Sequence, residues 1–218
     1  MRLRVATVVS GRGSNLAALL RALGDTAPAR IVLVISDRAN AGGLAVAAQH
    51  GIPTHVLNDS ADPAEWRRVL GAAKTDLVIL AGFIKRVPAE VVTTYRGRIL
   101  NIHPAPLPRY GGPGMYGRRV HEAVLAAGDA VSGASVHLVT EAYDQGAILG
   151  QATVPVRPDD TPDTLAARVL EVEHRLLPAA VLAAARAGRP VKFTLQDSGF
   201  RIEESGEGAV PSTLNPES

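Results

Sequence analysis

The chain has 218 residues, no cysteine and a net charge of only +2. The absence of cysteine excludes disulfides, thiolate zinc sites and a cysteine nucleophile. Because no apolar run reaches the length of a membrane span and no basic stripe with interleaved aromatic residues occurs, the sequence favours neither a membrane protein nor a nucleic-acid partner.

Strand-like and helix-like segments alternate along the first half of the chain. Its start lacks a signal peptide's apolar region and cleavage site, which favours the cytoplasm. Apolar runs predict strands at residues 5–9, 31–35, 52–57, 77–80 and 99–102. Helical spacing and small residues predict helices between them, at residues 16–23, 41–50, 63–73 and 88–95. The most apolar strand, at 77–80, is expected at the centre of the sheet.

The pattern changes in the second half of the chain. Residues 109–117 hold four glycines and a proline and must form a loop. The elements expected after it are a helix at 120–127, strands at 134–139 and 147–156, a long helix at 161–187 and an edge strand at 191–195. The connection between the first two of these strands is short, so it joins antiparallel strands and leaves no room for a helical crossover.

Repeated strand–helix–strand units predict an α/β fold. We expect a Rossmann-like, mostly parallel sheet with helices on both faces and an antiparallel C-terminal part. Residues 1–196 form a single domain in this interpretation. From Asp197 onward the chain is polar and has little to bury, so residues 197–218 are expected to be a mobile tail.

The segment Leu-Asn-Ile-His-Pro at residues 100–104 is the most informative feature of the sequence. Side chains alternate along a strand, so Asn101 and His103 project to the same face. Pro104 then ends the ladder, because proline has no N–H to donate. An amide that can stabilise an oxyanion therefore lies beside an imidazole that can move a proton. The structural alternative is a strand end whose polar residues cap the following turn.

A glycine-containing loop, Ser-Gly-Arg-Gly-Ser-Asn-Leu at residues 10–16, joins the first strand to the first helix. Glycines let the backbone approach a ligand, and a helix N-terminus offers unpaired N–H groups, so the loop suits a phosphate. It is not the dinucleotide fingerprint, because Leu16 stands in place of the third glycine. The structural alternative is a plain turn with Ser14 or Asn15 as the N-cap.

A polar loop at residues 139–146 contains Asp144. Its carboxylate could face His103 and stabilise the protonated imidazole. An aspartate close to a glycine is more often a turn residue, so this position alone decides nothing.

Together with two further motifs, these segments carry a resemblance that none carries alone. The further motifs are Leu-Ala-Gly-Phe at residues 80–83 and Gly-Ala-Ser-Val-His at residues 133–137. The combination resembles the phosphoribosylglycinamide formyltransferases over residues 5–195. The resemblance implies the formyltransferase fold, and transfer of a formyl group from 10-formyltetrahydrofolate to the amine of glycinamide ribonucleotide in purine synthesis.

The resemblance also implies roles for individual residues. The catalytic trio of the family matches Asn101, His103 and Asp144. The ribonucleotide site matches Gly13, Ser14, Asn15 and Glu173. The folate-binding segment matches Ile84, Lys85, Arg86 and Val87, together with Asn101.

In the implied mechanism the nucleophile is the substrate's own amine, so neither a serine triad nor a cysteine is needed. The Asn101 amide and a protonated His103 would stabilise the oxyanion, and His103 would carry a proton to the leaving folate nitrogen. Asp144 would orient His103 and raise its pKa. No step requires a metal. The implied partners are the two substrates, and the protein is expected to be a monomer or a homodimer.

Two positions depart from the family pattern. An arginine that contacts the folate often stands near the start of the helix before the central strand, where this chain has Pro63. Arg67 and Arg68 are the candidates to replace it. Residues 110–117 are longer and richer in glycine than in many relatives, and a mobile flap over the substrates is one role for them.

Four other interpretations stay open. His103, His121 and His137 could hold zinc in a metal hydrolase, although their spacing matches no compact zinc motif. A formyl-folate hydrolase would use the same catalytic trio with water, but is expected to carry an extra N-terminal regulatory domain. A methionyl-tRNA formyltransferase is expected to carry a C-terminal tRNA-binding domain. A non-catalytic nucleotide-binding module would explain the glycine loop and leave the strand-end residues unused.

Overall fold

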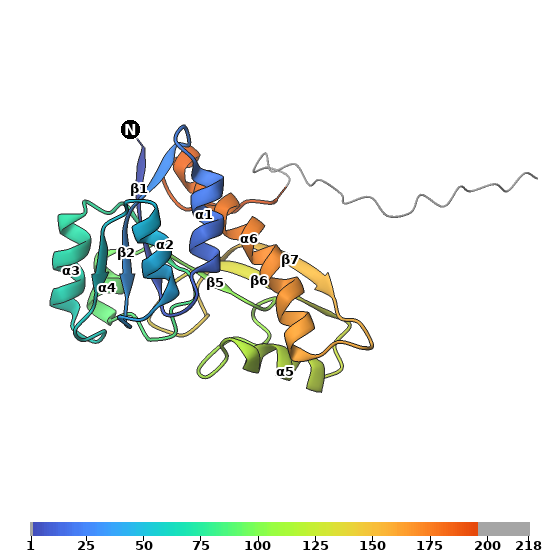
Figure 1. The fold of residues 1–218 in the computed structure, drawn as a ribbon. Coiled ribbons are helices and arrows are strands. Elements are labelled where there is room, and N and C mark those ends of the chain that lie inside the picture. The colour runs from blue at the N-terminus through green and yellow to red at the C-terminus, as the bar shows by residue number, and fades with distance from the viewer. Residues whose placement is uncertain (1, 196–218) are drawn as a thin grey trace, which may run out of the picture.

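The computed structural model describes residues 2–195, so the tail expected at 197–218 lies outside the described residues. One sheet of seven strands, in the order β3-β2-β1-β4-β5-β6-β7, forms the centre of the fold (Figure 1). The strands are β1 (Leu3–Val9), β2 (Ala29–Ser36), β3 (Thr54–Val56), β4 (Leu77–Leu80), β5 (Ile99–His103), β6 (Val131–Leu138) and β7 (Ile148–Pro155). The helices are α1 (Ser14–Leu23), α2 (Gly42–Gln49), α3 (Pro63–Ala72), α4 (Ala89–Thr94), α5 (Arg118–Ala126) and α6 (Pro162–Ala187).

The predicted fold class is confirmed. The first five strands pair in parallel, and β6 is antiparallel to both β5 and β7. The strand β4 lies in the middle of the sheet as expected, and all of its residues are buried. The sequence predicts this strand clearly because a strand covered by helices on both faces consists of a continuous run of apolar residues, not an alternation of apolar and polar residues.

Alternate residues of β1 contribute to two hydrophobic clusters, one on each face of the sheet. Val5 and Val9 belong to the cluster that also contains residues of α1, α2 and α6. Ala6 and Val8 belong to the cluster of α3 and α4, where Trp66 is fully buried. The long helix α6 packs on α1, β6 and β7, and so returns the C-terminal part of the chain to the first strand–helix junction (Figure 1). Within residues 2–195, no helix combines the length and apolarity that crossing a membrane requires.

The strand order reverses between β1 and β4. The chain builds β2 and β3 on one side of β1, and then crosses to build β4 and β5 on the other side. In open α/β sheets, such a switch point leaves a crevice at the carboxyl ends of the strands, where ligands bind. The glycine loop after β1, the segment after β4 and His103 at the end of β5 therefore reach the same edge of the sheet.

Residues 191–195 do not form a strand, so the prediction of an edge strand there is wrong. The backbone N–H of Phe193 donates to the carbonyl of Leu149 in β7, but the segment does not join the sheet. Instead, the Phe193 ring lies over Gly150, where an added Cβ would come within 2.4 Å of the ring. A segment that docks through alternate apolar side chains has the same sequence pattern as a strand.

Candidate active site

A cavity of about 830 Å³ opens at the carboxyl edge of the sheet. The segments that follow β1, β4 and β5 line it, together with residues 112–118, residues 139–144 and one face of α6. Most residues that the sequence singled out meet in it: Asn15, Ile84, Lys85, Arg86, Val87, Asn101, His103, Asp144 and Glu173. Gly13 and Ser14 are not among the lining residues, although Arg12 next to them is.

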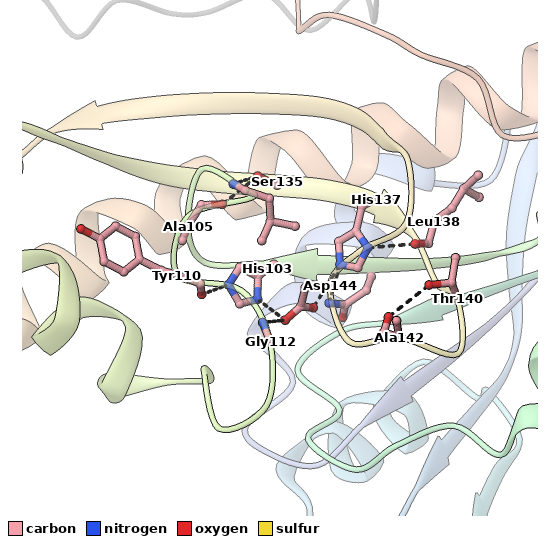
Figure 2. Close-up of polar contacts among 12 residues, drawn as sticks. His103, Ala105, Tyr110, Gly112, Ser135, His137, Leu138, Thr140, Ala142 and Asp144 are labelled. Carbon is pink, nitrogen blue, oxygen red and sulfur yellow. Dashed lines mark hydrogen bonds and ion pairs between the residues drawn. The ribbon is translucent and has the colours of Figure 1, made fainter.

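His103 is buried at the end of β5, with 3% of its surface exposed. Its Nε2 lies 2.8 Å from the backbone carbonyl of Tyr110 (Figure 2). A carbonyl oxygen only accepts hydrogen bonds, so Nε2 carries the proton in the neutral ring. The other ring nitrogen, Nδ1, lies 3.7 Å from Oδ2 of Asp144. Nδ1 is therefore the nitrogen that is free to take up and release a proton.

Asp144 faces His103, as the sequence suggested, from a residue in the left-handed backbone region with φ 53°. Its Oδ2 accepts a hydrogen bond of 2.8 Å from the backbone N–H of Gly112. Its Oδ1 lies 3.4 Å from Nε2 of His137. Burial alone would raise the pKa of Asp144, but the contacts with His137, Gly112 and His103 hold it below the ordinary value. The carboxylate is therefore ionised at neutral pH.

Opposing effects set the pKa of His103 in the ligand-free protein. Burial lowers the pKa of His103 below its ordinary value. Asp144 raises that pKa, as predicted, and so does the Tyr110 carbonyl, but both are outweighed by burial. Without bound substrate, His103 is a neutral base whose lone pair lies on Nδ1.

His137 is a site residue that the sequence analysis considered only within a motif and as a zinc ligand. Its Nε2 lies 3.1 Å from Nδ2 of Asn101, and its Nδ1 lies 2.9 Å from the carbonyl of Leu138. The Leu138 carbonyl only accepts, so Nδ1 donates to it, and Nε2 lies between Nδ2 of Asn101 and Oδ1 of Asp144. His137 pairs with Asn101 in the antiparallel register of β5 and β6. A register assumed for these two strands would have placed His137 beside Asn101 from the sequence alone.

The zinc alternative gains no geometric support. Among residues 2–195, no three histidine, cysteine, aspartate or glutamate side chains are grouped so that they could hold a metal ion. His121 lines the cavity from α5 and is buried, and its Nδ1 has no hydrogen-bond partner in the described part of the chain. Burial, and secondarily the repulsion that two protonated rings would exert at His121 and His103, lower its pKa, so it is a neutral ring in the cavity wall.

Asn15 does not cap α1, so that structural alternative is wrong. The N-cap is Gly13, with φ 82° and no side-chain hydrogen bond. Instead, Nδ2 of Asn15 donates to Oε2 of Glu173 on α6 at 2.6 Å, and both side chains are buried. Burial raises the pKa of Glu173 to about 7, although the Asn15 hydrogen bond lowers it. Two residues far apart in the sequence thus form one polar wall of the cavity.

The folate segment expected after β4 lies along the cavity. The backbone N–H of Ile84 donates to Oγ of Ser10 at 3.3 Å, which joins this segment to the glycine loop. Nη2 of Arg86 donates to the carbonyl of Glu141 at 2.5 Å, and its guanidinium lies 5.9 Å from the centre of the Tyr143 ring. Arg86 therefore links the segment after β4 to the loop that carries Asp144, and both line the cavity.

Neither candidate for the missing family arginine lines the cavity. Pro63 is the first residue of α3, and the carboxylate of Asp62 caps that helix. Arg67 lies 3.6 Å from Glu90, and Arg68 is exposed. These positions leave Lys85 and Arg86 as cations beside the predicted folate segment.

We expect the Glu173→Gln variant to be more stable than the wild type at pH 8 and nearly equal to it at pH 5. The folded-state pKa of about 7 lies above the ordinary 4.5, so the folded protein holds a proton that the unfolded chain releases between these values. Wild-type stability therefore falls as the pH rises through this window. A shift of this size corresponds to at most about 3 kcal/mol. Urea unfolding of both proteins at pH 5 and pH 8 measures it, and an equal difference at both pH values would contradict it.

Comparisons with known proteins agree with this geometry. Residues 3–181 match the sequence model of a family described as formyl transferase. The chain is 42% identical over 183 residues to the chloroplastic phosphoribosylglycinamide formyltransferase of Arabidopsis thaliana, an alignment that covers 80% of this chain and 63% of that protein. The enzyme of the same name from Haemophilus influenzae is 37% identical, with 80% of this chain and 84% of that protein covered.

Solved structures give the same result. The phosphoribosylglycinamide formyltransferase of Anaplasma phagocytophilum superposes with a TM-score of 0.81 at 39% identity, covering 86% of this chain and 88% of that one. A formyltetrahydrofolate deformylase from Pseudomonas syringae superposes with a TM-score of 0.77 at 26% identity, covering 86% and 62%.

Some relatives are longer than the part that this chain matches. The chain covers only 63% of the Arabidopsis protein, and 14% of the trifunctional purine biosynthetic protein of Drosophila melanogaster. The family assignment depends on the matched part alone, and that part contains every element that builds the cavity. The chain therefore belongs to the formyl transferase family.

Proposed function

We propose that the protein transfers the formyl group of 10-formyltetrahydrofolate to the amine of glycinamide ribonucleotide, a step of purine synthesis. The observation that carries the proposal is the His103–Asp144 pair, whose reactive nitrogen Nδ1 lies in a cavity shared with the Asn101 amide. The volume of about 830 Å³ is near the upper end for small-molecule sites, which suits two substrates bound together.

The proposed reaction begins with attack of the amine nitrogen on the formyl carbon. The carbonyl oxygen becomes an oxyanion, to which the second N–H of the Asn101 amide donates while the first is held by His137. Nδ1 of His103 takes the proton that the amine loses, and Asp144 stabilises the imidazolium. The carbon–nitrogen bond to the folate then breaks as His103 delivers that proton to the leaving nitrogen.

We place the two substrates at opposite ends of the cavity. The ribonucleotide lies near Asn15 and Glu173, with its phosphate at the N-terminus of α1, where backbone N–H groups at Gly13 and Ser14 have no helical partner. The folate lies along residues 84–87, where Ile84 and Val87 are apolar and Lys85 and Arg86 can attract its carboxylates.

The affinity for the ribonucleotide is expected to rise as the pH increases from 6 to 8. Ribose hydroxyl groups that donate to Glu173 favour the carboxylate over the acid, so binding releases a proton from a group with a pKa of about 7. Because the ligand's phosphate and amine also titrate, the Glu173→Gln variant supplies the baseline. Calorimetric titration of both proteins measures the difference, and parallel pH dependences would remove Glu173 from the ribonucleotide site.

The Gly13→Ala variant is expected to lose about 1–3 kcal/mol of stability and to bind the ribonucleotide less well. Gly13 has φ 82°, and an added Cβ would lie 2.5 Å from Cα of Gly43. The loop must therefore move, which disturbs the N–H groups at the start of α1. The Michaelis constant for the ribonucleotide should rise more than that for the folate. Gly71→Ala is the matched control, because an added Cβ meets nothing within 4 Å there.

Hydrolysis of the formyl-folate is the second candidate, favoured by the similarity to the Pseudomonas deformylase. Both reactions use the formyl-folate as donor, so they differ in the acceptor, which is the amine of the ribonucleotide in transfer and water in hydrolysis. Loss of 10-formyl-dideazafolate is followed by absorbance with and without glycinamide ribonucleotide. Turnover that depends on the ribonucleotide supports transfer, whereas equal turnover in its absence supports hydrolysis.

A further inference from the structure

We propose that Tyr110 and Asp129, which lie behind the catalytic trio, are positioning residues that fix the tautomer of His103. The proposal rests on the proposed function only for its effect on turnover. The placement of the His103 proton can be measured without any substrate.

The contact between the two residues and the site is the backbone carbonyl of Tyr110. It accepts from Nε2 of His103 at 2.8 Å, and so reserves Nδ1 for the reaction. In Figure 2 this carbonyl points at the His103 ring, while the phenol of Tyr110 extends away from the His103–Asp144 pair. The carbonyl could not stay there if the backbone at Tyr110 turned, because its direction depends on that residue's dihedral angles.

The backbone at Tyr110 adopts a conformation that its own chemistry disfavours. Its φ is 58°, in the left-handed region where a Cβ approaches the following carbonyl. Glycines at residues 112, 114 and 117 take positive φ in the same loop, where they have no such cost. A tyrosine in this conformation needs stabilising contacts that offset its cost.

Two polar side chains provide such contacts. The Tyr110 hydroxyl donates to Oδ2 of Asp129 at 2.5 Å and accepts from Nη2 of Arg109 at 3.1 Å. Nη1 of Arg109 lies 2.8 Å from the same Asp129 oxygen. The three side chains close a triangle, and the Tyr110 ring packs against the cluster of α1, α2 and α6. Asp129 lies in the short connection between α5 and β6, so the triangle ties the loop to these two elements.

The triangle of Tyr110, Asp129 and Arg109, called the Tyr110 clamp below, affects the chemistry because the Tyr110 carbonyl and the Asp144 carboxylate compete for the proton of the His103 ring. If the Tyr110 carbonyl moved away, the neutral ring would favour a proton on Nδ1, where Asp144 accepts it, and would lose its free base. The other charged or titratable groups near His103 are His137 on β6 and His121 on α5, which belong to elements other than the loop of Tyr110. The Tyr110 carbonyl also raises the pKa of His103, so its loss should lower that pKa.

The test measures the His103 ring by ¹⁵N NMR in the wild type, in Tyr110→Phe and in Asp129→Asn. Tyr110→Phe retains the aromatic ring and removes the hydroxyl that donates to Asp129. Asp129→Asn retains the shape of the side chain and removes the charge that pairs with Arg109. We expect the wild type to show the proton on Nε2, and each variant to show a mixture of tautomers and a lower His103 pKa. Tyr95→Phe is the matched control, a tyrosine next to Arg98 and outside the cavity.

The same variants are assayed for formyl transfer. We expect kcat to fall about fivefold, the change that corresponds to one ordinary hydrogen bond, with the folate Michaelis constant nearly unchanged. Wild-type nitrogen shifts and pKa in both variants would overturn the proposal, even if stability fell. If Tyr110→Phe did not fold, Asp129→Asn would decide alone. An inactive wild type with shifted tautomers in the variants would refute the proposed function and leave this inference intact.

Discussion

Replacement of His103 by alanine is expected to lower kcat by about a hundredfold or more. Nδ1 of His103 is the nitrogen that both accepts the amine proton and delivers it to the leaving folate nitrogen in the proposed reaction. Nε2 of His137 also lies near Asp144, at 3.4 Å, but it faces the Asn101 amide at 3.1 Å, so we assign the proton transfer to His103. Steady-state rates at saturating concentrations of both substrates measure the loss.

The control for this prediction is His50→Ala. His50 is exposed at the end of α2, outside the cavity, so its removal should leave kcat unchanged. Added imidazole should restore part of the activity of His103→Ala, because the buried space that the ring leaves opens into the cavity. A folded His103→Ala variant that kept more than about a tenth of the wild-type kcat would show that the proton takes another route.

The Asp144→Asn variant is expected to lose about ten- to a hundredfold in kcat, and its pH profile should change. The asparagine side chain can still accept from the N–H of Gly112, so it keeps the shape and removes the charge. Without that charge the imidazolium is less stable, so the pKa of His103 falls further. The free enzyme needs neutral His103, and the acidic limb of kcat/KM should therefore move to lower pH.

NMR titration of His103 in both proteins checks this sign directly. Asp37→Asn is a suitable control, because Asp37 has a buried carboxylate that does not line the cavity. An unchanged His103 pKa in Asp144→Asn would make Asp144 a turn residue, as its positive φ permits. The catalytic group would then reduce to Asn101 and His103.

The sequence predicted the fold well where burial alone decides the pattern. The strand β4 and the pair Asn101 and His103 followed from apolar runs and from the alternation of side chains. The segment at 191–195 failed because an apolar alternation also describes a chain that docks one aromatic ring on the sheet. The alternation of apolar residues indicates which side chains are buried, but it does not show whether the backbone of the segment pairs with a neighbouring strand.

Contacts between distant segments were beyond the sequence for a different reason. The hydrogen bond between Asn15 and Glu173 depends on the path of α6 back to the first helix, which no local rule determines. Whether the pKa of His103 lies above or below its ordinary value depends on how completely neighbouring elements bury the ring. The contact between Tyr110 and Asp129 was also beyond the sequence. Tyr110 has a left-handed backbone conformation, where sequence rules for turns expect glycine or asparagine, and its partner Asp129 lies beyond α5 in the chain.

The fate of the formyl carbon tests the central claim most directly. The wild-type protein is incubated with glycinamide ribonucleotide and a 10-formyl folate that carries ¹³C in the formyl group, and the products are read by ¹³C NMR. We expect the label in a formamide on the ribonucleotide, at a rate that falls about a hundredfold or more in His103→Ala. Label released as formate at the same rate with or without the ribonucleotide would contradict formyl transfer to the amine.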